Sequence, residues 1–214
     1  MRWSVLVLLL VSLGGFMAWA GCKGKHSVTP NLKQLDIQLV QGTSDVTGIN
    51  YIVNFAAYAG HVGPPIPCGS EDLGGGQPIL KAGLLWFDMS QVSSNAQVYE
   101  ATLVLTVNEA PSSGIEVELR DLSVNPMLVN PNDPTQCQNA YDDACSGKLY
   151  ATINVDASQT TVEVPLGTDA LTDIENAISA GTGFGIGLRA PSADASNIVP
   201  VSFKMDVYIR LKYR

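Results

Sequence analysis

Hydrophobic and polar residues alternate along most of the chain after residue 32. A period of two is typical of β-strands that bury one face and expose the other. This alternation predicts strands at 35–39, 101–107, 115–119, 150–155, 161–164 and 184–188. It is clearest near the end of the chain, where one half-buried strand is predicted from the alternate apolar residues Val201, Phe203, Met205, Val207, Ile209 and Leu211.

One segment, at about 168–181, follows a helical period instead. Its apolar residues are Ala170, Leu171, Ile174, Ala177 and Ile178. Thr168 is a candidate N-cap, and Gly181 is placed to end the helix. We expect this helix to plug an end of the fold or to join two strands across it. Many short strands with one short helix predict an all-β fold, a jelly-roll-like two-sheet antiparallel β-sandwich.

Glycines alternate with strand residues directly after the predicted helix, at Gly183, Gly185 and Gly187. Their spacing is not the G-x-G-x-x-G of nucleotide-binding loops. We therefore interpret the segment as a strand whose glycine face lets the helix or another backbone approach closely.

Two turn-rich stretches, 60–77 and 125–147, are predicted to be long loops. The first contains three consecutive glycines at 74–76, and the second contains three prolines and two cysteines. Loops of this length are often functional, and the alternative is that both are surface insertions.

The first 21 residues have the layout of a secretory signal peptide, because a basic start is followed by an apolar run and small residues. Ala18-Trp19-Ala20 fits one cleavage site, whereas Ala20-Gly21-Cys22 resembles the end of a lipobox. In the lipobox reading Cys22 is lipidated and 22–31 forms a tether, so the protein is a bacterial lipoprotein at the outer membrane or cell surface. The alternative is a freely secreted protein. Residues 32–214 are predicted to form one β-sandwich domain.

How the other three cysteines pair depends on whether Cys22 is lipidated. Cys137 and Cys145 lie close together in a polar segment, and we expect them to form a disulfide in an oxidising compartment. Cys68 is then free or, if Cys22 is not lipidated, paired with Cys22.

The formal net charge of −8 argues against nucleic acid as a partner, because phosphate binding needs a basic surface. Polysaccharides, envelope proteins and cations are more compatible partners. The chain has two histidines, His26 and His61, and no G-x-S-x-G motif. We interpret His61 as a solvated loop residue. Carboxylates that alternate with core residues normally form the solvated face of a sheet, so we predict that the protein is not an enzyme.

Several segments resemble the DNRLRE-type domain family, also described as disaggregatase-related repeats. LLWFDMS at 84–90 is similar to its L-L-R-F-D-L-S hallmark, and ATLVLTV at 101–107 is similar to its A-T-L-x-L-x-V strand. GFGIGLR at 183–189 is similar to a late strand of the family. The resemblance spans 81–213 and implies a jelly-roll-like domain of exported, cell-wall-associated proteins, some of them similar to carbohydrate-binding modules. Trp86 stands where the family has arginine, so no particular ligand is carried over.

Sugar binding needs an exposed aromatic surface with hydrogen-bonding neighbours. If Leu85 and Phe87 face the core, as the resemblance implies, Trp86 points outward. Tyr208 and Arg210 alternate with apolar residues on the last strand, so both are predicted to face outward as well. Trp86, Tyr208 and Arg210 are therefore the candidate carbohydrate-binding residues. The alternative for Trp86 is ordinary packing under a loop or the N-terminal segment.

A candidate calcium site lies in the segment predicted to carry the disulfide, because calcium takes six to eight hard oxygen ligands. Its candidate ligands are Asn130, Asn132, Asp133, Asp142 and Asp143. The alternative is a solvated acidic loop, since the same residues are common in turns.

Three functions follow from this sequence. The first is a non-catalytic cell-surface module that binds polysaccharide or another envelope component. The second is a structural or assembly lipoprotein of a surface complex, for which we expect a broad apolar patch or an unprotected edge strand. The third is a glycan-active enzyme, which needs two carboxylates roughly 5 to 10 Å apart across a cleft.

Overall fold

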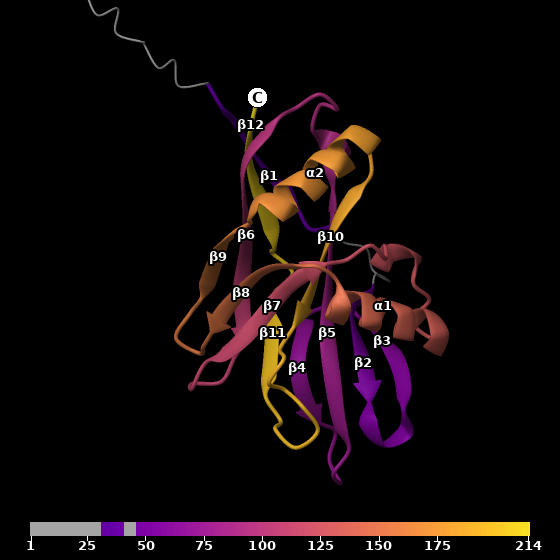
Figure 1. The fold of residues 1–214 in the computed structure, drawn as a ribbon. Coiled ribbons are helices and arrows are strands. Elements are labelled where there is room, and N and C mark those ends of the chain that lie inside the picture. Colours follow the sequence, from indigo (N-terminus) through magenta and orange to yellow (C-terminus); the bar gives the residue numbers. More distant parts are fainter. Residues whose placement is uncertain (1–30, 41–45) are drawn as a thin grey trace, which may run out of the picture. The chain divides into compact units, whose positions relative to one another are not determined.

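Two antiparallel β-sheets form the body of the protein, in a computed structural model that describes residues 31–40 and 46–214 (Figure 1). Sheet A has the strand order β1 (Lys33–Gln38), β12 (Tyr208–Tyr213), β6 (Val98–Glu109) and β9 (Thr161–Pro165). The chain from 31 to 214 forms one compact unit. It is an all-β sandwich, as predicted.

Sheet B is built around β5 (Pro78–Asp88). One edge of β5 pairs with β2 (Val46–Ile52), which pairs in turn with β3 (Ala57–Val62). Along the other edge lie β4 (Ile66–Asp72) and β10 (Gly183–Arg189), and β10 continues to β7 (Ile115–Asp121) and β8 (Leu149–Val155). β11 (Pro200–Phe203) pairs with β4 and also with β6, which links the two sheets.

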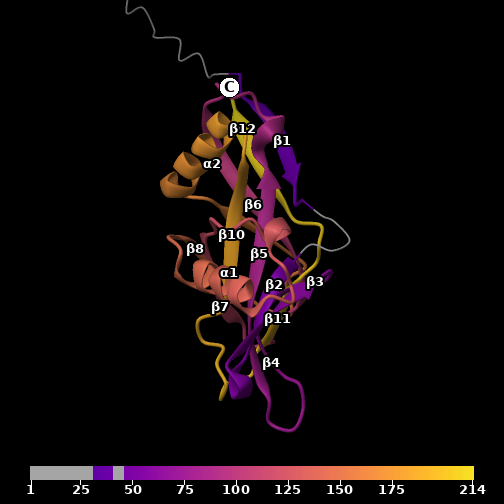
Figure 2. The same cartoon turned by 90° about the vertical axis from the view of Figure 1, so that its right-hand side faces the viewer.

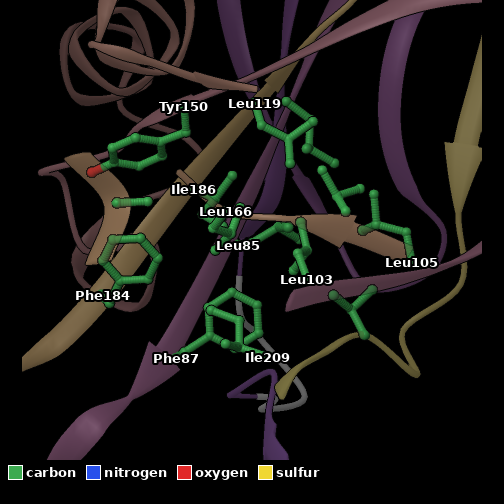
Figure 3. Close-up of a cluster of buried hydrophobic side chains, with 14 of the residues drawn as sticks. Leu85, Phe87, Leu103, Leu105, Leu119, Tyr150, Leu166, Phe184, Ile186 and Ile209 are labelled. Carbon is green, nitrogen blue, oxygen red and sulfur yellow. The ribbon is translucent and has the colours of Figure 1, made fainter. Parts of the chain in front are cut away.

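The core lies between the inner faces of the two sheets (Figure 3). Leu85 and Phe87 of β5 meet Leu103 of β6 and Ile209 of β12, and all four are 0% exposed. Burial of such side chains contributes about 1.5–3 kcal/mol each. The period of two therefore arises because each strand covers this core with alternate residues.

Helix α2 (Thr168–Ala180) confirms the predicted helix and joins β9 of sheet A to β10 of sheet B (Figure 1). Ala170, Ile174 and Ile178 are buried in the core. Gly181 ends the helix in the left-handed conformation, at φ 64°. The N-cap is Gly167 rather than Thr168, which is the first helical residue.

A second helix, α1 (Pro134–Ser146), occupies most of the segment predicted to be the 125–147 loop, which is a correction. Asp133 caps it and accepts hydrogen bonds from the backbone N–H groups of Thr135 and Gln136. Its buried residues are Cys137, Ala140 and Ala144, which are small and lie among polar residues. The apolar stripe is therefore too weak to stand out in the sequence, although α1 packs on the outer face of sheet B (Figure 2).

The disulfide predicted between Cys137 and Cys145 is wrong, because both thiols are free. The two residues lie eight positions apart on one continuous helix, so their Cα atoms are about 12 Å apart. A disulfide requires Cα atoms within about 7 Å. Cys68 is also free and lies buried in the core.

Two other sequence interpretations need correction. The predicted 60–77 loop contains β4, and its three glycines form the turn to β5, all with positive φ. The long terminal strand is two strands, because β11 lies in sheet B and β12 in sheet A, with a break between Phe203 and Tyr208.

The predicted signal peptide, Cys22 and the tether as far as residue 30 lie outside the described residues. Among the residues that are described, α1 and α2 have 13 residues each, and no helix there is long and apolar enough to cross a membrane.

Candidate functional site

Trp86 lies on the outer face of sheet B, as predicted, and is half-buried. Its indole ring rests on the glycine face of β10. A Cβ atom at Gly183 would lie 2.2 Å from the indole nitrogen Nε1, and one at Gly185 would lie 2.9 Å from ring atom Cε3. The missing side chains of these glycines therefore make the seat for the ring.

The third glycine of this face confirms that a helix backbone approaches closely. A Cβ at Gly187 would lie 2.6 Å from the Cα of Ala144 in α1. The approaching helix is α1, which was not predicted, rather than α2.

An open hollow of about 730 Å³ lies beside Trp86. Its wall combines apolar surface from Trp86, Leu122 and Phe184 with polar side chains from β7, α2 and the connecting segments. The polar residues are Asp121, Ser123, Asn125, Asp173, Asn176 and Thr182. Pockets that bind small ligands typically have this size and mixture of surfaces.

Several polar atoms of this hollow have no protein partner among the described residues. They are the indole N–H of Trp86, the side-chain amide of Asn176 and the hydroxyl of Thr182. Unpaired donors and acceptors beside an aromatic ring are what the hydroxyl groups of a sugar would need.

Asp143 of α1 holds one wall of the hollow in place. Its carboxylate accepts hydrogen bonds from the backbone N–H groups of Ser123 and Val124, at 2.8 Å each, and from the Ser123 hydroxyl at 3.0 Å. α1 therefore fixes the segment that carries Leu122 and Ser123 toward Trp86.

A second wall contains two carboxylates that share one phenol. The hydroxyl of Tyr150 lies 2.9 Å from Asp121 Oδ1 and 2.8 Å from Asp173 Oδ2, and Lys148 Nζ lies 2.6 Å from Asp173 Oδ2. Burial, together with Asp173 and Asp121, raises the pKa of Tyr150, so the phenol stays protonated. The ring of Tyr150 stacks on that of Phe184, with 5.7 Å between the ring centroids. The Tyr150 hydroxyl points away from the aliphatic cluster (Figure 3).

Tyr208 and Arg210 also face outward, as predicted, but on sheet A, so they lie on the opposite side of the core from Trp86. Arg210 donates to the Tyr208 hydroxyl at 2.8 Å and lies 3.3 Å from Asp36 and 3.4 Å from Glu163. The structure thus does not bring the three predicted carbohydrate-binding residues together.

The five candidate calcium ligands do not meet at one point. Asn130 and Asp133 lie at the N-terminal end of α1, where Asn130 accepts from the N–H of Asn132 at 3.0 Å. Asp142 and Asp143 lie near the other end, about 13 Å along the helix. In the described part of the chain, no three His, Cys, Asp or Glu side chains are grouped to hold a metal ion.

His61 lies on β3 and is half-buried, so its interpretation as a solvated loop residue is wrong. It lines a second hollow of about 470 Å³. Its Nδ1 lies 3.1 Å from the Thr47 hydroxyl, which donates to the Gly63 carbonyl at 2.7 Å. Burial and the charge of Lys81 lower the pKa of His61. Lys81 is paired with Glu71, while Asp72 and Glu109 also line this hollow.

Asp173, Asn176 and Thr182 were not among the predicted site residues. A signal was present, because Asp173, Asn176, Ala177 and Ala180 recur at helical spacing on the predicted helix, and all four line the hollow. Ser123 carried no signal, because it lies outside any periodic element, and Asn125 was marked only as the first residue of the 125–147 stretch.

No protein-family model matches this chain, and no curated protein matches it either.

Proposed function

We propose that this protein is a non-catalytic surface module that binds polysaccharide in the hollow beside Trp86. The observation that carries the proposal is the indole ring of Trp86 in a hollow of about 730 Å³ whose polar atoms are partly unpaired. The apolar face of a pyranose ring stacks on an aromatic ring, while its hydroxyl groups need donors and acceptors around it.

The sequence features support the same proposal. A signal peptide with a lipidated Cys22 would hold the domain at the bacterial cell surface, where polysaccharides are abundant. The resemblance to the DNRLRE-type family also favours a module that is exported and associated with the cell wall. Whether glycan binding needs calcium is tested in the same experiment.

Binding to a glycan array tests this function, with a protein of residues 23–214 that includes the whole described unit. Trp86→Ala removes the ring, and Tyr208→Ala is the matched control, because it removes an outward aromatic side chain from sheet A. Both variants are checked for folding by circular dichroism, and each array is run with calcium and with a chelator.

We expect saturable binding that Trp86→Ala abolishes and Tyr208→Ala preserves. Equal loss in both variants would contradict the assignment of the site to Trp86. If no glycan binds with or without calcium, the proposal fails and a protein partner becomes the better explanation.

A second candidate, a glycan-active enzyme, is favoured by one observation. Asp121 and Asp173 line the same hollow, and Asp121 Oδ1 and Asp173 Oδ2 are no more than about 6 Å apart, since both contact the Tyr150 hydroxyl. However, Asp173 is also paired with Lys148, and Asp121 contacts the Tyr150 hydroxyl, so each carboxylate already has one protein partner. Release of reducing ends from a bound glycan, lost in Asp121→Asn, would favour the enzyme over the binding module.

The assembly alternative is less well supported. Exposed large apolar residues are spread over separate turns and element ends, for example Phe55, Leu73, Leu128 and Leu149. Among the described strands, β1, β3, β8 and β9 each pair on one edge, which leaves edges that a partner could extend.

A further inference from the structure

The charges around the Trp86 hollow are unevenly distributed. Asp121 and Asp173 line it, and no lysine, arginine or histidine does. The nearest cation described at this wall, Lys148, contacts Asp173 Oδ2 and does not line the hollow. A ligand in the hollow therefore meets a wall of net negative charge.

The two carboxylates are not neutralised by their shared phenol. The Tyr150 hydroxyl lies within 3 Å of Asp121 Oδ1 and of Asp173 Oδ2. It has one proton, which it can donate to only one carboxylate at a time. Asp121 Oδ2 and Asp173 Oδ1 have no partner among the described residues. Each of these two carboxylates, on residues that line a hollow with an aromatic ring, thus keeps one oxygen without a protein partner among the described residues.

We propose that the Trp86 hollow prefers glycans with free amino groups, with the ring stacked on Trp86 and the ammonium group on Asp121 and Asp173. The inference rests on the proposed function. A protonated amine donates charge-assisted hydrogen bonds to a carboxylate, whereas a neutral hydroxyl group donates weaker ones and a uronate is repelled. Trp86 supplies affinity for the sugar ring, and the acidic wall selects among sugars of the same shape.

The test compares three β-1,4-linked tetrasaccharides, of glucosamine, N-acetylglucosamine and glucose, by isothermal titration calorimetry. The pH is held above the pKa of carboxyl groups and below that of the sugar amine. We expect the glucosamine tetramer to bind about tenfold more tightly than the other two, which corresponds to about 1.4 kcal/mol.

Asp121→Asn keeps an acceptor for Tyr150 but removes the charge, so we expect the preference to fall to about twofold. Glu116→Gln is the matched control, because Glu116 lies on the same strand, is exposed and does not line the hollow. This variant should keep the tenfold preference. A salt titration of the unchanged protein gives a second readout, since about 0.5 M salt should reduce the preference.

The outcomes separate the two proposals. Equal affinity for the three tetramers, all lost in Trp86→Ala, would overturn the amino-sugar preference and leave the binding module intact. A preference that survives both Trp86→Ala and Asp121→Asn would also overturn it, because it would reflect general attraction of a cation to an acidic protein. An array on which no glycan binds would remove the proposed function itself.

Discussion

Trp86 and Tyr208 have the same position in the sequence pattern and different surroundings in the fold. Both are outward-facing aromatic residues between core residues, Trp86 on β5 and Tyr208 on β12. Trp86 borders a hollow with unpaired polar atoms, whereas Tyr208 is engaged by Arg210, whose guanidinium lies 5.4 Å from its ring centroid. Strand parity therefore predicts which aromatic residues face outward, but their neighbours decide which of them can take a ligand.

The largest expected difference between these two faces is in glycan affinity. Trp86→Ala should weaken binding by at least about 2 kcal/mol, or about thirtyfold, because a central aromatic contact is removed. Tyr208→Ala should leave the affinity unchanged. Trp86 is the sole tryptophan beyond residue 21, so quenching of its fluorescence by acrylamide, and protection by bound glycan, measures the contact directly.

A side chain added on the glycine face of β10 would occupy the space where the indole ring of Trp86 packs. Gly185→Ala places a Cβ 2.2 Å from the carbonyl oxygen of Leu122 and 2.9 Å from the indole ring. We expect a loss of about 1–3 kcal/mol in the free energy of unfolding, measured with urea, and a shifted Trp86 fluorescence spectrum.

Gly167→Ala is the control for this substitution, because a Cβ there meets nothing nearer than the Tyr150 carbonyl oxygen at 4.0 Å. Gly167→Ala should lower the free energy of unfolding less than Gly185→Ala does, and it should leave the fluorescence spectrum unchanged. An unshifted spectrum in Gly185→Ala would contradict the seat described for the ring.

The network on the Tyr208 face should contribute little to stability. Arg210→Ala removes contacts to Asp36, Glu163 and Tyr208, but exposed ion pairs contribute little because water and salt screen them. We expect the thermal midpoint to change by about 2 °C or less, with glycan binding unchanged. A fall of many degrees in a calorimetric scan would show that this face is part of the structural core.

The smallest expected effect concerns calcium. The five candidate ligands lie at both ends of α1, so a chelator should leave the thermal midpoint and the Trp86-dependent binding unchanged. A midpoint that rises with added calcium, and falls again with the chelator, would show that these residues form a site after all.

The hollow shows how much of a site can be predicted from such a sequence. Trp86 was predicted to face outward because the resemblance to the DNRLRE-type family implied that Leu85 and Phe87 face the core. Asp173 and Asn176 could have been found from the period of α2. Ser123 could not, because its position depends on hydrogen bonds from its backbone N–H and its hydroxyl to Asp143, which lies 20 residues later on a helix with a weak apolar stripe. Similarly, Cys137 and Cys145 are close in sequence and were paired wrongly, since a helix separates residues that a loop would bring together.

By itself the sequence determined the all-β class, the orientation of most strand residues and the position of α2. These follow from local periodicity, because burial of alternate residues leaves a trace in every strand. The tertiary structure alone decided that the chain crosses from sheet B to sheet A between β11 and β12, and that α1 covers sheet B. It also decided that Asp121, Asp173 and Trp86 share one hollow, because three-dimensional proximity between distant segments is set by packing and leaves no periodic signal.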